Sequence, residues 1–378
     1  MNWLRRLIKT QARGMNANEV KIIFALSMIK GLGDTKLRNL LSQFGLPSKV
    51  VEADLELLAQ AVGDKLASEI KELRDYDRAS KYYEKIKNLG GEVVIWGQAG
   101  YPKSLVDIPH APPFLTVLGA LQDIDERALA IVGTRRPSHA GVKVAHDIAY
   151  ELASAGITIV SGLAVGIDSV AHRAALEAGG RTIAVLGCGI DIVYPREHKD
   201  LAERIAKNGA VISEFLPGTP PEAFNFPKRN RLISGLAMGT LVVEAGARSG
   251  ALITAKHAKA QGKPVFAVPG TPVAETSAGT NELLKTGAKL VTSAKDIFEA
   301  LGIKITKPDE VSRVMDAARG LSEDEKRVFN ALTAEPVHID VLAKKLGIPT
   351  SSLLTLLLRL ELKGLVRQLP GTQFVRNL

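Results

Sequence analysis

The clearest strand-to-helix transition in the sequence is Ile157-Thr158-Ile159-Val160-Ser161-Gly162-Leu163-Ala164-Val165-Gly166-Ile167-Asp168. An apolar, β-branched run gives way to a glycine-rich loop, and a helical pattern starts near Asp168. Similar runs recur through residues 92–300, separated by amphipathic windows such as 140–155 and 251–261. Continuous apolar strands that alternate with helices predict a parallel, doubly wound α/β sheet.

Nine strands are predicted for this sheet. They cover residues 93–96, 115–118, 130–132, 157–160, 182–186, 210–212, 240–243, 264–268 and 289–291. Ligands of such sheets bind outside the carboxyl ends of the strands, so the loops that follow the strands are where a site is expected.

These loops are rich in Gly, Ser and Arg. Gly133-Thr134-Arg135 follows one strand, Ser161-Gly162 with Gly166 follows the next, and Ser249-Gly250 lies in the loop after residues 240–243. Arg196 comes after Tyr194-Pro195. Backbone amides and cations gathered at one sheet edge favour an anion, most simply a phosphate.

The most cationic part of that edge is Phe226-Pro227-Lys228-Arg229-Asn230-Arg231-Leu232-Ile233-Ser234-Gly235-Leu236. Three cations within four positions repel one another unless they are solvated or face an anion. Pro227 indicates a nearby helix start, where free backbone N–H groups also favour an anion. Arg229 or Arg231 can instead hold neighbouring loops, so Arg135 and Lys228 are the preferred phosphate contacts.

Bulk properties limit the remaining choices. The net charge is +9, yet residues 97–302 carry only 21 Lys and Arg against 19 Asp and Glu, which favours a focused anion site there. The single cysteine, Cys188, excludes an internal disulfide and a cysteine-rich metal site, and we expect it to pack behind a glycine turn. No membrane span and no signal peptide are predicted, which points to the cytoplasm.

Catalytic and cofactor motifs are missing. No Walker A sequence occurs, and Gly187-Cys188-Gly189 lacks the third glycine of a dinucleotide fingerprint. Asp168 and His172 are interpreted as a helix cap and a packing or hydrogen-bonding histidine. We therefore expect binding and no catalytic residues, cofactor or metal.

Residues 1–91 are predicted to form a helical module. A helix over 20–29, a turn with Gly31 and Gly33, and a second helix over 36–45 resemble a helix-hairpin-helix unit. Such a turn can present N–H groups to a phosphate, or it can be an ordinary helical hairpin. More amphipathic helix covers 55–87.

The end of the chain predicts a winged-helix-like module over 321–378, after a linker over 303–320. Three helices, opening at Ser322, His338 and Ser351, precede two strands over 365–369 and 373–377 with a turn at Pro370-Gly371. The third helix carries Arg359 as its one cation among many leucines over 351–360. This pattern favours a protein-contact or packing role over reading of the DNA major groove.

The chain resembles the DNA-processing protein A family (DprA, also called Smf) over nearly all of residues 92–300. The cationic segment 226–236 is its most specific part. The resemblance also includes Val132-Gly133-Thr134-Arg135, Ser161-Gly162-Leu163-Ala164, Gly166-Ile167-Asp168, Ala171-His172, Ala184-Val185-Leu186-Gly187 with Tyr194-Pro195, Ser213-Glu214, Val243-Glu244-Ala245, 249–255, Val268-Pro269-Gly270, Gly279, Asn281 and Gly287-Ala288. Two departures are Thr134, usually Ser in the family, and Val165, often a cation.

The resemblance implies an extended Rossmann-like domain that binds single-stranded DNA without turnover. It implies roles in natural transformation: protection of incoming strands, loading of the RecA recombinase and dimerisation. The N-terminal helices resemble a sterile-alpha-motif-like module. By motif, the DNA-binding residues are Gly133, Thr134, Arg135, Ser161, Gly162, Gly166, Arg196, Lys228, Arg229, Asn230, Arg231, Ser249 and Gly250.

Two questions stay open at this point. Phe224, Phe226 or Tyr194 can stack on a base, but for the two phenylalanines a place in the core is at least as good an interpretation. The alternative function is a nucleotide-processing Rossmann enzyme of the lysine-decarboxylase-like phosphoribohydrolase type, with Glu244 at the sheet edge. Only Pro269-Gly270-Thr271 of that group's Pro-Gly-Gly-x-Gly-Thr signature is present.

Overall fold

The computed structural model describes residues 16–74, 76–303, 321–332, 336–362, 365–369 and 371–376. The chain separates into two compact units, divided after Ile303. Apart from Ile303, the predicted linker over 303–320 lies outside the described residues, as do Pro370 of the predicted turn and Asn377 of the last strand. The boundary predicted after residue 91 stays a prediction, because the N-terminal helices and the sheet belong to one compact unit.

All nine predicted strands are present and form one sheet, in the order β1-β2-β6-β5-β4-β3-β7-β8-β9. The strands are β1 (Glu92–Ile95), β2 (Phe114–Gly119), β3 (Ala128–Val132), β4 (Thr158–Ser161), β5 (Thr182–Val185), β6 (Gly209–Ser213), β7 (Thr240–Val242), β8 (Val265–Ala267) and β9 (Lys289–Leu290).

Seven strands, from β6 to β9 in the sheet order, are parallel, whereas β1 and β2 are antiparallel to their neighbours. The expectation of a parallel sheet is therefore right for the centre and wrong for one edge. A parallel neighbour needs a long crossover, usually through a helix. The β1–β2 connection contains only the four-residue α7 (Lys103–Val106), and β2 leads to β3 through the short η1 (Asp123–Glu126).

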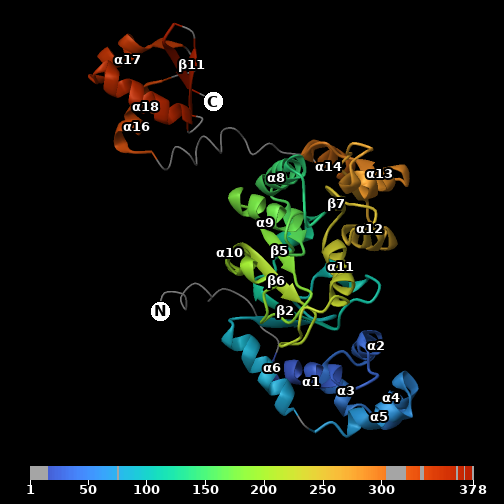
Figure 1. Cartoon of the computed structure of the whole chain (residues 1–378). Helices are drawn as coiled ribbons and strands as arrows, with labels where there is room; N and C mark the ends of the chain where they lie inside the picture. Colours follow the sequence, from blue (N-terminus) through green and yellow to red (C-terminus); the bar gives the residue numbers. More distant parts are fainter. Residues whose placement is uncertain are drawn as a thin grey trace. The chain divides into compact units, whose positions relative to one another are not determined.

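Helices cover both faces of the sheet (Figure 1). Within β3, Leu129 and Ile131 pack with α8 and α9, while Ala130 and Val132 pack with α11 and α12. This alternation buries both faces, which explains the continuous apolar runs. The helices of this part are α8 (His139–Ser154), α9 (Ile167–Glu177), α10 (Lys199–Asn208), α11 (Asn225–Leu236), α12 (Ala251–Ala260), α13 (Ala278–Lys285) and α14 (Ala294–Leu301), with 3-10 turns η2 (Arg196–His198) and η3 (Glu275–Ser277).

The order in which the chain adds strands to the sheet reverses after β6, and the two halves meet where β3 pairs with β7. Strands β3 to β6 extend toward one edge, after which β7 returns to pair with the other side of β3. The helices change face at the same point, since α8 and α9 cover one side and α11 and α12 the other. The crevice at the carboxyl ends of β3 and β7 is the topological switch point, where open α/β sheets bind ligands.

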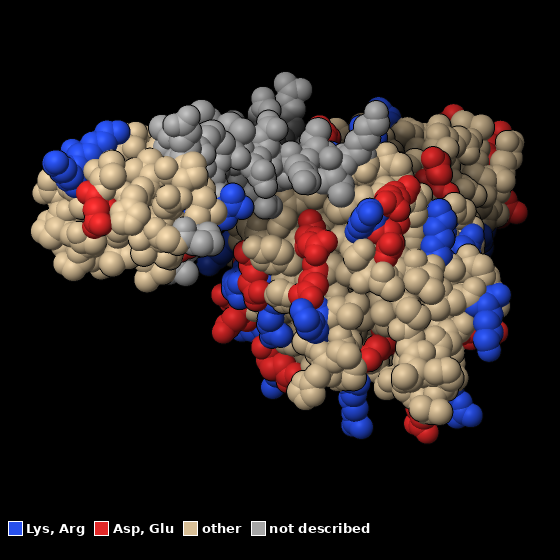
Figure 2. All heavy atoms as spheres, turned by 90° about the horizontal axis from the view of Figure 1, so that it is seen from above, with Lys and Arg blue, Asp and Glu red and all other residues tan. Residues whose placement is uncertain are grey.

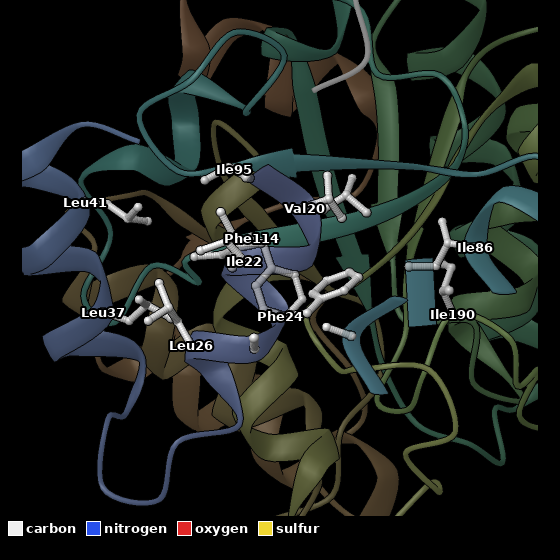
Figure 3. Packing of buried hydrophobic residues seen from close by; sticks show 14 of the residues in the cluster. Val20, Ile22, Phe24, Leu26, Leu37, Leu41, Ile86, Ile95, Phe114 and Ile190 are labelled. Carbon is white, nitrogen blue, oxygen red and sulfur yellow. The ribbon is translucent and has the colours of Figure 1, made fainter. Parts of the chain in front are cut away.

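The N-terminal helices share a hydrophobic core with the sheet. Phe24 is fully buried and meets Phe114 of β2 edge-on, with ring centroids 5.1 Å apart, and Figure 3 shows this packing around Ile22 and Leu37. Burial of large apolar side chains across this boundary stabilises the helices against the sheet. They are α1 (Ala17–Ser27), α2 (Asp34–Phe44), α3 (Pro47–Glu52), α4 (Leu55–Val62), α5 (Asp64–Lys71) and α6 (Asp77–Asn88).

The second unit has the predicted three helices plus a three-stranded sheet. Its elements are α16 (Glu323–Ala331), α17 (Ile339–Leu346), α18 (Thr350–Leu362), β10 (Val337–His338), β11 (Val366–Leu369) and β12 (Gln373–Arg376), and the sheet order is β10-β12-β11. The short β10 was not predicted, because two residues carry no period-two pattern. On α18, Leu353, Leu357 and Leu360 are buried, while Leu354 and Leu358 are exposed. Whether this module contacts DNA or protein stays a prediction.

No single helix among the described residues is long and apolar enough to cross a membrane. Taken together, α17 and α18 meet the length and composition criteria, but they are bent by 107°. Their apolar character has a second explanation, since Leu342 of α17 and three leucines of α18 form the core of the winged-helix unit.

Candidate functional site

A cavity of about 780 Å³ lies at the switch point. Its walls come from the loops after β3, β4, β5 and β7 and from α11, so strand ends distant in sequence converge on it. Seven of the predicted site residues line it. They are Gly133, Thr134, Arg135, Arg229, Asn230, Ser249 and Gly250.

The Phe226 ring lines this cavity and lies close to two arginines and one tyrosine. The Arg135 guanidinium lies 5.7 Å from its ring centroid and that of Arg229 lies 6.0 Å from it, while the Tyr194 ring is 5.7 Å away. A side chain at Gly187 would collide with the ring, since a Cβ there would be 2.7 Å from Phe226 Cδ1. The ring thus holds the exposed Arg135 by cation–π attraction. Of the other aromatics, Tyr194 is 44% and Phe224 72% exposed.

Arg229 is buried, and its guanidinium donates hydrogen bonds to backbone carbonyls of the protein. Its Nη1 donates to the carbonyl oxygens of Gly162, at 2.8 Å, and of Val185. These carbonyls follow β4 and end β5, so the guanidinium ties two loops to α11. Burial lowers the pKa of Arg229 to about 10, against the opposing effect of the Asp168 carboxylate. Burial likewise raises the pKa of Asp168, while Arg229 acts to lower it.

In the loop after β4, the polar groups of Ser161 and Gly162 bond within the protein, and glycine is required at Gly166. Gly162 N–H donates to Asp168 Oδ2 at 3.1 Å, and Ser161 Oγ donates to the Ile131 carbonyl at 2.6 Å. Gly166 has φ +85° and sits where a Cβ would be 2.4 Å from the Thr134 carbonyl, so only glycine fits. None of these three predicted residues lines the cavity. The Ser161 hydroxyl and the Gly162 amide are buried and already bonded within the protein, and their predicted ligand role stays a prediction.

Helix α11 divides the cationic segment between two cavities. Phe226, Asn230 and Ile233 share the face that lines the first cavity, as positions four and seven apart on a helix do. Lys228 and Arg231, three apart, line a second cavity of about 450 Å³ beside Asp34 and Lys36 of α2. The cations that are adjacent in sequence therefore point to different places.

The two cations that α11 supplies to the second cavity are ion-paired. Arg231 is buried and donates from Nη1 and Nη2 to the Glu214 carboxylate at 2.6 and 2.7 Å. Lys228 Nζ lies 3.0 Å from Asp34 Oδ2 and 3.5 Å from Glu214 Oε2. The preference for Lys228 as a phosphate contact is thus not supported by its position, since it does not line the first cavity and carboxylates already neutralise it.

Arg196 is exposed at the start of η2, two residues after Tyr194, and does not line the cavity.

Among the cavity-lining residues, the one cation that was not predicted from the sequence is Arg248, although the loop after β7 was predicted to be part of the ligand edge. Asn230 Nδ2 donates to the Gly250 carbonyl at 3.3 Å and so ties this loop to α11. Two features of the sequence could have identified Arg248, namely its positive charge and its position in the loop after β7.

On the face shown in Figure 2, Lys and Arg are intermixed with Asp and Glu, and no broad field of one sign forms. In the cavity the balance differs. Its lining includes the exposed Arg135 and Arg248, whereas its one carboxylate, Asp168, is buried. An incoming anion therefore meets unpaired positive charge at the rim.

The groups weighed for catalysis have structural partners. Glu244 accepts hydrogen bonds from Ser138 N–H at 2.9 Å and Ser138 Oγ at 2.5 Å, at the start of α8, and does not line the cavity. His172 is buried as expected, with Nδ1 2.7 Å from Thr182 Oγ1. Cys188 is buried, and burial raises its pKa to about 11. Among the described residues no group of His, Cys, Asp and Glu has the arrangement of a metal site.

Comparison with known proteins assigns both units to one family. Residues 92–302 match the family model for DNA recombination-mediator protein A, and residues 313–372 match that for the DprA winged helix domain. The chain belongs to the DNA recombination-mediator protein A (DprA/Smf) family. The resemblance inferred from the sequence is confirmed, together with the α/β sheet, the helical N-terminal region and the winged helix.

Several relatives cover most of the chain. Protein Smf of Synechocystis is 33% identical over 93% of this chain and 98% of its own length, and the putative DNA processing protein DprA of Mycobacterium tuberculosis is 39% identical over 83% and 85%. The crystal structure of DprA from Streptococcus pneumoniae superposes with a TM-score of 0.66 at 35% identity, covering 76% of this chain and 98% of that one. DprA from Helicobacter pylori, a protein with a described single-stranded DNA binding mode, gives 0.51 at 31% identity, covering 56% and 95%.

Proposed function

We propose that this chain is a non-enzymatic, cytoplasmic single-stranded DNA-binding protein that mediates recombination. It would bind incoming strands during natural transformation, protect them and load the RecA recombinase on them, acting as a homodimer. The observation that carries the proposal is the cavity at the switch point. It combines the exposed Arg135 with a nearby aromatic ring, Tyr194, which is 44% exposed. Family membership and the single-strand binding of the Helicobacter pylori relative support the same assignment.

The physical case for a single strand rests on what the cavity offers. Arg135 can neutralise a phosphate, and Tyr194 or Phe224 can stack on a base whatever its identity. A cavity of about 780 Å³ has room for unpaired nucleotides, whereas a duplex keeps its bases stacked inside. Two guanidinium groups lie within 6.0 Å of the Phe226 ring centroid, which makes Phe226 a support for Arg135 in preference to a stacking surface.

The test is binding of a fluorescent oligothymidine across a salt series. We expect the wild type to bind single strands more tightly than duplex and Arg135→Ala to weaken binding, with the salt slope smaller by about 0.7 for one lost phosphate contact. Arg204→Ala, which removes an exposed arginine of α10, is the matched control. If the wild type does not bind single strands, the proposed function is wrong. If Arg135→Ala equals the control, the site assignment is wrong.

The alternative is a phosphoribohydrolase-type enzyme, which would place a carboxylate at the sheet edge. Glu244 occupies that edge, but Ser138 already donates to both of its oxygens. Release of free base from a nucleoside monophosphate at an enzymic rate, lost in Glu244→Gln, would favour the enzyme. We expect no release above the uncatalysed background.

A further inference from the structure

A second exposed cation, Arg248, lies on the wall of the cavity that is formed by the loop after β7. Within the described part of the chain, its guanidinium has no hydrogen bond or ion pair. The neighbouring backbone is well fixed, because Ser249 N–H donates to the Gly246 carbonyl at 3.0 Å and Gly250 accepts from Asn230. A free cation on a fixed loop is suited to capture an anion.

Arg248 and Arg135 come from different parts of the sheet edge. Arg135 follows β3 and is held over the Phe226 ring, whereas Arg248 follows β7 and leads into α12. These strands flank the switch point, and their following helices lie on opposite faces of the sheet. The two loops therefore diverge, and each supplies one arginine to the same cavity.

The size and charge of the cavity fit a ligand with more than one phosphate. Its volume of about 780 Å³ lies in the upper part of the usual range for small-molecule sites, roughly 300–1,000 Å³. Two unpaired guanidinium groups in one cavity repel each other when no anion is bound. Arginine also offers a planar fork of donors that matches a phosphate in two-point contact.

We propose that Arg248 is a phosphate ligand of this site and that it grips a different backbone phosphate from the one held by Arg135. The cavity then takes a nucleic-acid segment of at least two phosphates, with its base-binding space between two arginine contacts. The inference rests on the proposed single-strand binding and names the second contact of that site.

The experiment compares Arg248→Ala, Arg248→Lys, Arg135→Ala, the double alanine variant and the Arg204→Ala control in oligothymidine binding over a salt series. We expect Arg248→Ala to lower the salt slope by about 0.7 and the double variant by about 1.4. Arg248→Lys should keep the wild-type slope with weaker binding, because a lysine keeps the charge without the fork. Thermal unfolding checks that each variant is folded.

Additivity decides whether the two arginines share a phosphate. Independent phosphates predict that the two losses of binding free energy add in the double variant. A double variant no weaker than Arg135→Ala alone would overturn the two-phosphate assignment. Arg248→Ala binding like Arg204→Ala would overturn the role of Arg248, even while Arg135→Ala still supports the site. If the wild type does not bind oligothymidine at all, the proposed function itself is wrong.

Discussion

The guanidinium of Arg231 and the carboxylate of Glu214 form a two-point ion pair in the interior, with N–O distances of 2.6 and 2.7 Å. Arg231 Nε also donates to the carbonyl of His110 at 3.0 Å, so the pair joins α11, the end of β6 and the loop before β2. In sequence Arg231 belongs to a cationic cluster. In the fold it is an internal cross-link.

Breaking this pair should destabilise the protein strongly. Arg231→Ala removes both hydrogen bonds from the guanidinium to the buried Glu214 carboxylate and leaves that carboxylate the Lys228 ammonium, 3.5 Å away. Removal of one partner of a buried ion pair costs roughly 3–5 kcal/mol. Urea unfolding followed by circular dichroism measures the loss. Lys295→Ala, which removes an exposed pair with Glu299, is the control and should change the unfolding free energy little. A small effect of Arg231→Ala would show that the pair is dispensable.

Replacement of Lys228 should leave the salt dependence of DNA binding unchanged. Lys228 Nζ is paired with Asp34 of α2 and lies outside the first cavity, so Lys228→Ala removes a link to the helical hairpin and no phosphate contact. We expect faster amide hydrogen exchange over residues 34–44 in this variant, because one anchor of α2 is lost. Asp34→Ala should reproduce that result. A salt slope smaller by about 0.7 in Lys228→Ala would restore this lysine as a phosphate contact.

Gly162→Ala should disturb the loop after β4. A Cβ at this position would lie 2.6 Å from Arg229 Nη2 and 2.7 Å from its Nη1, inside the buried hydrogen-bonded cluster. Overpacking of this kind typically costs roughly 1–3 kcal/mol. The matched control is Gly250→Ala, where a Cβ meets nothing within 4 Å. Equal melting temperatures for the two variants would mean that the Arg229 side chain moves aside freely.

Acid should destabilise the fold through His172. Its Nδ1 is bonded to Thr182 Oγ1, whose own proton goes to the Ile159 carbonyl, so the histidine donates from Nδ1 and its buried Nε2 has no partner among the described residues. Protonation would bury an unbonded N–H and a charge. Burial accordingly lowers the pKa of His172 to about 3.

The sign follows from proton uptake. The unfolded chain protonates this histidine near pH 6.5 and the folded one only near pH 3, so stability is full above 6.5 and falls as the pH drops toward 3. The slope from this group is about 1.4 kcal/mol per pH unit. His172→Gln should flatten the decline measured by urea unfolding. His146→Gln should have the opposite effect. A hydrogen bond to Glu177 raises the pKa of His146, so protonated His146 stabilises the fold, and this variant should lose stability at acid pH only. Parallel acid profiles for wild type and His172→Gln would contradict this assignment.

The sheet could be predicted from the sequence because strand cores are local. Each of the nine apolar runs became a strand, and glycine-rich loops after them marked the ligand edge. The antiparallel pairing of β1 and β2 was not predicted, since strand direction depends on the path of the connection, which no run of residues encodes. Arg135 was identified for a similar local reason, as a cation directly after a strand.

The roles of the clustered cations were decided only by the tertiary structure. Lys228, Arg229 and Arg231 look alike in sequence, yet helix geometry turns them to different surroundings. Arg229 meets carbonyls 67 and 44 residues away, and Arg231 meets a carboxylate 17 residues away. The sequence by itself determined that cations gather at this sheet edge. The fold decided which of them remain free for an anion, because a charge is available to a ligand only where no buried carbonyl or carboxylate already satisfies it.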